Sequence, residues 1–138
     1  MGASEIIENN KLIAEFMGFV EDDKIYTNKS KSNPLPPFWN QGFSNKCCED
    51  DIRFHSSWDW LMPVLEKIES LGCKTVASQS DFNDNQYINI MTGISIINQD
   101  AQNPSKFMGQ DKIKINAYYK AIVEFIKWIN QNDTRRNQ

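Results

Sequence analysis

His55 is the only histidine of the chain and the residue best suited to acid–base chemistry near neutral pH. Asp59 or Asp51 would pair with it as an acid–base couple. Cys47 or Cys48 would instead supply a thiol nucleophile that the imidazole activates. If the protein is an enzyme or a small-molecule binder, we therefore expect its site to be built from His55, Asp59 and Cys48.

The same segment has a second interpretation that requires no catalysis. Ser56 is placed to cap a helix, and Asp59, three residues later, completes a pair that resembles a capping box. His55 would then be a turn residue that packs against Trp60 in the manner of a hydrophobic staple. We favour this interpretation because no other segment of the sequence assembles a recognisable active site.

The remaining ligand-like residues do not form a metal or cofactor motif. Cys47 and Cys48 are adjacent, whereas tetrahedral zinc sites use spaced pairs of cysteines. The group around Asp81 and Asp84 lacks the glycine and the distant glutamate of a calcium loop. The glycines, Gly109 among them, are isolated and are expected in turns and caps, not in a phosphate-binding loop. We therefore expect no metal and no cofactor.

Length, charge and hydropathy predict one domain over residues 1–138. The chain has 40% hydrophobic residues and a net charge of -3, which is typical of a folded globular protein. That charge gives no reason to expect binding to nucleic acid or to an anionic membrane. No apolar run is long enough to span a bilayer and the start of the sequence does not resemble a signal peptide, so we expect a cytoplasmic protein with reduced thiols.

A long stretch without periodicity, residues 28–54, is expected to be an irregular loop. Loops of that length in compact domains commonly bind a partner or are mobile. Its aromatic residues Phe38, Trp39 and Phe43 are candidates for a contact surface on a partner protein. They could equally fold back as a lid on the hydrophobic core, and the sequence leaves both alternatives open.

The periodicity of the apolar residues predicts an α+β fold. A three- to four-stranded, mainly antiparallel sheet is packed by three α-helices in the order α-β-α-β-β-β-α, and residues 131–138 form a frayed tail. Gly18 supplies the left-handed stop of the first helix, and Trp58 and Trp60 border the apolar stripe of the second. The expected helices cover residues 4–18, 56–72 and 111–130, and the expected strands cover residues 24–27, 73–78, 87–91 and 94–97.

Three pieces of the chain resemble a family of small bacteriophage- and prophage-encoded proteins of unknown biochemical function. They are Asn10–Gly18, the helix that starts with His55-Ser56-Ser57-Trp58-Asp59-Trp60-Leu61-Met62-Pro63, and Tyr118–Asn130. The resemblance implies a phage or mobile-element setting in a bacterial host and no catalytic residues to carry over. A non-enzymatic module that binds a host or phage protein is the function we expect. The alternatives are a small-molecule binder or hydrolase with a pocket near His55, and a structural or virion assembly component.

Overall fold

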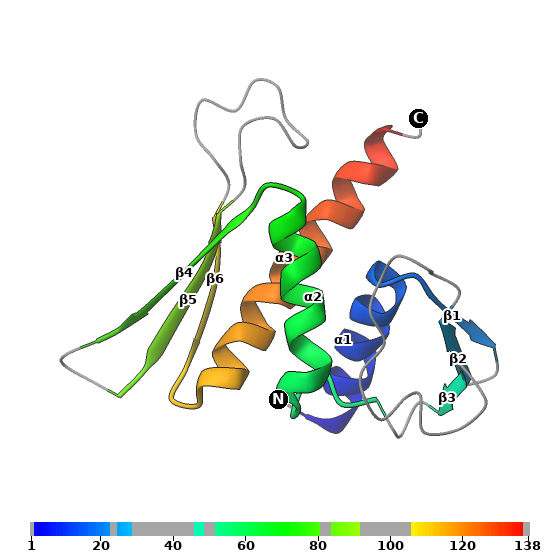
Figure 1. Cartoon of the computed structure of the whole chain (residues 1–138), viewed down its shortest axis with the longest axis horizontal. Coiled ribbons are helices and arrows are strands. Elements are labelled where there is room, and N and C mark those ends of the chain that lie inside the picture. Colours follow the sequence, from blue (N-terminus) through cyan, green and yellow to red (C-terminus); the bar gives the residue numbers. More distant parts are fainter. Residues whose placement is uncertain are drawn as a thin grey trace. The chain divides into compact units, whose positions relative to one another are not determined.

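The computed structural model describes residues 2–22, 25–28, 46–48, 52–80, 84–91 and 106–136, and it confirms the α+β class. Three helices and a three-stranded antiparallel sheet lie in the predicted order, and a second three-stranded antiparallel sheet is present as well (Figure 1). The chain divides into two compact units, Met1–Val64 and Leu65–Gln138. The single domain expected over residues 1–138 stays a prediction.

The first unit begins with a helix and continues with a small sheet. Gly18 has φ 87° and ends the helix in the left-handed region, as predicted. The helix buries Ile13 and Ala14, which lie on its apolar stripe. The elements are α1 (Ala3–Phe16), β1 (Phe19–Asp22), β2 (Ile25–Asn28) and β3 (Lys46–Cys48), with sheet order β1-β2-β3.

This sheet differs in part from the expectation. Strand β2 confirms the strand predicted at residues 24–27. Residues 19–22, which are not among the expected strands, form β1, and β1 pairs with β2 along its whole length. Residues 46–48, expected in an irregular loop, form β3 because they pair with residues 25–27. Backbone pairing creates both strands: β1 forms a hairpin with the adjacent β2, and β3 pairs with β2 from farther along the chain, which no local pattern reveals.

The helix α2 (Trp58–Ser70) has its cap one residue later than predicted. The Ser57 carbonyl accepts hydrogen bonds from the Trp60 and Leu61 amides, so Ser57 and not Ser56 occupies the capping position. The helix continues through Pro63 and is followed by Gly72, whose φ of 95° is left-handed. The unit boundary after Val64 falls inside this helix.

The two tryptophans of α2 have different environments. Trp60 is fully buried and packs edge-on against Phe54, with ring centroids 5.2 Å apart. Phe54 in turn stacks on Phe19, with centroids 6.2 Å apart. Trp58, the other tryptophan at the border of the apolar stripe, is 38% exposed. The aromatic residue that packs on Trp60 before the helix is Phe54, where we expected His55 to take that role.

The second unit contains a three-stranded meander and a long helix. Its third strand is β6, which was not among the expected strands. Residues 94–97, the strand expected in its place, lie outside the described residues. The helix continues to Arg136, through residues expected in the frayed tail. The elements are β4 (Lys74–Gln79), β5 (Gln86–Met91), β6 (Lys106–Asp111) and α3 (Lys114–Arg136), with sheet order β4-β5-β6.

The helix α3 covers one face of this sheet, mainly over β6 and β5 (Figure 1). Ile122, Phe125 and Ile126 are buried, as the helical periodicity predicts. Gly109 lies within β6, not in a turn or cap as expected. A side chain would not fit at this position, because a Cβ would come within 1.9 Å of the Ala117 carbonyl oxygen. The absence of a side chain lets the strand and the helix approach closely.

Candidate functional site

The face of the β4-β5-β6 sheet that points away from α3 is the main candidate for a binding surface. Side chains alternate between the two faces of a strand, and Ile88 and Ile90 of β5 are fully buried on the α3 side. Asn89 of β5 therefore points to the opposite face. The pairing register places Val76 and Met108 on either side of it, in one row across the sheet.

The two apolar members of this row are exposed. Val76 has 48% and Met108 has 52% of its surface accessible to solvent. Tyr87 and Met91 lie on the same face of β5 and are half-buried. A row of this kind is informative because exposed apolar side chains that lie together on one face mark sites of protein contact.

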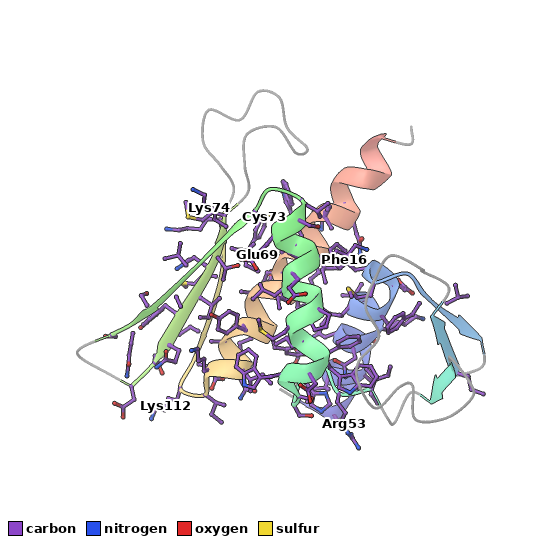
Figure 2. All side chains as sticks on the ribbon, viewed as in Figure 1. Phe16, Arg53, Glu69, Cys73, Lys74 and Lys112 are labelled. Atoms are coloured by element: carbon purple, nitrogen blue, oxygen red, sulfur yellow. The ribbon has the colours of Figure 1, made fainter. Side chains whose placement is uncertain are left out.

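The charged residues of the sheet stand at its two ends. Lys74 starts β4, and Lys106 is in the same cross-strand row, through Met91. Figure 2 shows Lys74 at one end of the sheet and Lys112, in the turn before α3, at the other. The middle of the uncovered face therefore carries no charge, and the polar groups form a rim around it.

Among the residues predicted for a site, His55 has a defined polar partner. The Asn10 Nδ2 amide donates a hydrogen bond to His55 Nδ1 over 3.0 Å, and this bond joins α1 to the turn before α2. Because Nδ1 is the acceptor, the ring proton of a neutral imidazole lies on Nε2. Asn10 is only 6% exposed, so the bond also satisfies a buried amide.

Burial lowers the pKa of His55 below its usual value, and the positive charge of Arg53 lowers it further. Both effects favour the neutral ring, which is also the form that accepts the Asn10 hydrogen bond. The sequence reasoning missed Asn10 because it lies 45 residues away from His55. The signal available in the sequence was an asparagine pair, Asn9-Asn10, on the helix face that also carries Ile13.

The other predicted site residues are not joined to His55 in the described part of the chain. Asp59 is exposed in the first turn of α2, and no hydrogen bond or ion pair links it to His55 among the described residues. The backbone of Cys48 lies in β3, opposite Ile25. The aromatic residues Phe38, Trp39 and Phe43 lie outside the described residues.

Neither the third cysteine, Cys73, nor the acidic residues form a reactive or metal-binding group in the described part of the chain. Burial raises the pKa of the Cys73 thiol to about 11, which keeps it protonated and poorly nucleophilic. Within residues 2–22, 25–28, 46–48, 52–80, 84–91 and 106–136, no three His, Cys, Asp or Glu residues cluster in a way that could hold a metal ion. No helix in the same part of the chain is long and apolar enough to cross a membrane.

Comparison with protein-family models, with curated proteins and with solved structures finds no match to this chain. The evidence for the candidate sites is therefore the geometry of their residues.

Proposed function

We propose that this protein is a non-enzymatic binding module, a small phage or mobile-element accessory protein that contacts a host or phage protein through the uncovered face of the β4-β5-β6 sheet. The observation that carries the proposal is the exposure of Val76 and Met108 in one uncharged row across that face. The mobile-element setting is supported by the sequence resemblance alone.

The surface has the composition that a transient protein contact needs. A valine and a methionine supply apolar area, and methionine adapts its shape to different partners. Asn89 between them offers an amide donor and acceptor that can fix the register of a partner. Lys74 and Lys106 at one end favour a partner that carries acidic residues next to its apolar contact. Phe38, Trp39 and Phe43 remain candidates for a second part of the contact surface.

A pocket near His55 is the second candidate, and one observation favours it. The buried Asn10 amide holds the His55 ring in place as a neutral imidazole. A fixed, neutral ring suits recognition of a small polar ligand better than proton abstraction. The same bond also holds α1 to the turn before α2, and that structural role explains it without a ligand.

The test compares two lysine substitutions in a pull-down from lysate of the bacterial host. Met108→Lys places a charge in the middle of the proposed surface. Ile113→Lys replaces a residue that is 58% exposed and precedes α3, outside that surface, so it serves as the matched control. The proposal predicts a protein that wild type and Ile113→Lys retain and Met108→Lys loses, with direct binding then shown with the purified partner.

The opposite results would contradict the proposal. Equal retention of every captured protein by Met108→Lys and by wild type would show that the sheet face is not the contact surface. A small molecule that co-purifies with wild type and disappears with His55→Ala, while the variant stays folded, would instead support the pocket near His55. Loss of a protein partner only with Trp39→Ala would move the contact to the predicted aromatic loop.

A further inference from the structure

The β4 edge of the β4-β5-β6 sheet carries a second feature, separate from the face of the sheet. The Ser80 amide donates to the Asn85 carbonyl over 3.3 Å, which makes 80 and 85 a hydrogen-bonded pair. Such pairs alternate along an antiparallel ladder, so residues 74, 76 and 78 bond to β5 as well. The N–H and C=O groups of Thr75, Ala77 and Gln79 consequently point away from the sheet.

These outward groups form an open row. Among the described residues, nothing hydrogen-bonds to the backbone of Thr75, Ala77 or Gln79 on that side. The six residues of β4 pair with β5 without a bulge, and the strand contains no proline. Five of the six are exposed, so neither face of this strand is covered along its length. Natural edge strands are commonly protected from pairing by a bulge, a proline or charged side chains. Of these, β4 has only the charged Lys74 at its start.

The opposite edge of the sheet is protected. By the same alternation, the Gln110 carbonyl of β6 points outward, and the Lys120 ammonium of α3 donates to it over 3.1 Å. The same ammonium lies 2.9 Å from Asp111 Oδ2, which fixes it at this edge. Among the described residues, Lys120 of α3 therefore occupies part of the β6 edge, and no comparable contact is made at the β4 edge.

We propose that the β4 edge pairs with β4 of a second copy of this chain, in antiparallel orientation about a two-fold axis at Val76. The two three-stranded sheets would join into one six-stranded sheet, and a two-fold contact of this kind closes without forming a fibre. The row of apolar side chains on the uncovered face would then be continuous across both copies.

The strand is complementary to itself in this register. Thr75 and Ala77 of the partner subunit form a hydrogen-bonded pair, and symmetry repeats it, so the outward backbone groups are satisfied reciprocally. Val76 faces Val76 of the partner subunit in a non-hydrogen-bonded pair, where side chains approach most closely. Lys74, the only charged residue of β4, lies opposite Ser78 of the partner subunit, so no like charges meet.

Sedimentation velocity over about a hundredfold range of protein concentration tests the pairing. The wild type should shift from its monomer mass of 16.0 kDa to twice that value as the concentration rises. Ala77→Pro removes only an outward amide and should stay monomeric with an unchanged circular dichroism spectrum. Val76→Lys places two ammonium groups opposite each other and should weaken dimerisation by about tenfold or more, without any change to the backbone.

Met108→Lys is the control because it changes the face but not the β4 edge, and it should dimerise like wild type. A wild type that stays at 16.0 kDa throughout, or a Val76→Lys variant that dimerises as wild type does, overturns the pairing. If Ala77→Pro fails to fold, Val76→Lys decides the question. Loss of partner capture by Met108→Lys tests the sheet face independently of the edge, so the two proposals can fail separately.

Discussion

At the scale of single residues, Gly109 is the position least able to accept a side chain. A Cβ there would lie 1.9 Å from the Ala117 carbonyl oxygen and 2.7 Å from the Ala121 amide nitrogen. Both atoms belong to the backbone of α3, so the strand and the helix would have to separate. We expect Gly109→Ala to lower the free energy of unfolding by about 3 kcal/mol in urea denaturation.

The matched control for this substitution is Gly2→Ala. A Cβ at Gly2 has no atom within 4 Å, and the residue is exposed before α1. Its effect on the same measurement should stay within about 0.5 kcal/mol. Equal stability of the two variants would show that β6 and α3 do not approach each other as closely as described.

His55 is expected to titrate below its usual value of 6.5. Because the folded protein then binds fewer protons than the unfolded chain, this residue makes stability decrease as the pH falls from 6.5 through the folded pKa. Nitrogen-15 NMR of the single histidine measures both the pKa and the tautomer, which should be Nε2–H at neutral pH. Arg53→Gln removes a repelling charge and should raise the pKa.

A titration at or above 6.5, or a neutral ring protonated on Nδ1, would contradict this description. The first result would mean that the imidazole is not shielded from water. The second would mean that the Asn10 amide presents its oxygen, not its N–H, to the ring. Either result would also remove the structural argument against His55 as a general base.

At the scale of elements, the connection between β6 and α3 depends on Asp111. Its Oδ1 accepts the Ile113 amide over 2.9 Å, and the Ile113 carbonyl accepts the Ala117 amide at the start of the helix. Residue 111, at which the third helix is expected to begin, instead ends β6, and its carboxylate orders the turn that leads into α3.

The pKa of Asp111 is lowered, first by the Ile113 amide and then by the Lys120 side chain. The stability that this carboxylate contributes is therefore present above 3.8 and is lost as the pH falls through the folded pKa. We expect Asp111→Ala to lower the free energy of unfolding at pH 7 by about 1 kcal/mol in urea denaturation.

Asp111→Asn separates the two contributions. It keeps a side-chain oxygen for the Ile113 amide and loses the negative charge that pairs with Lys120. Because a partly exposed ion pair contributes little, the loss should be about 0.5 kcal/mol or less. An equal loss in Asp111→Asn and in Asp111→Ala would show that the ion pair, and not the turn, is the main contribution.

At the scale of the whole molecule, the Cys73 thiol reports on opening of the folded state. With its pKa raised to about 11, roughly one molecule in a thousand carries a thiolate at pH 8. In a Cys47→Ser and Cys48→Ser background, Ellman's reagent should react with Cys73 at least about a hundredfold more slowly in buffer than in urea. Equal rates would show that the thiol is accessible in the folded protein.

The sequence by itself determined the elements whose residues repeat with a local period. The buried stripe of α3, the left-handed stop at Gly18 and the strand β5 follow from side-chain spacing and backbone sterics within a few residues. His55 could be singled out by its chemistry. The tertiary structure decided its partner, because a hydrogen bond to Asn10 depends on where α1 lies and not on the residues around His55.

Dependence on contacts in space also explains why the two sheets differ from the prediction. Residues 19–22, 46–48 and 106–111 are strands because other strands pair with them, and β6 also needs a glycine where α3 crosses it. Alternation along β4 does not reveal that the strand lies at an edge, or that Val76 and Met108 share an uncovered face. Exposure of a strand is a property of its neighbours in space, so only tertiary structure decides which strand edges and faces remain free for a partner.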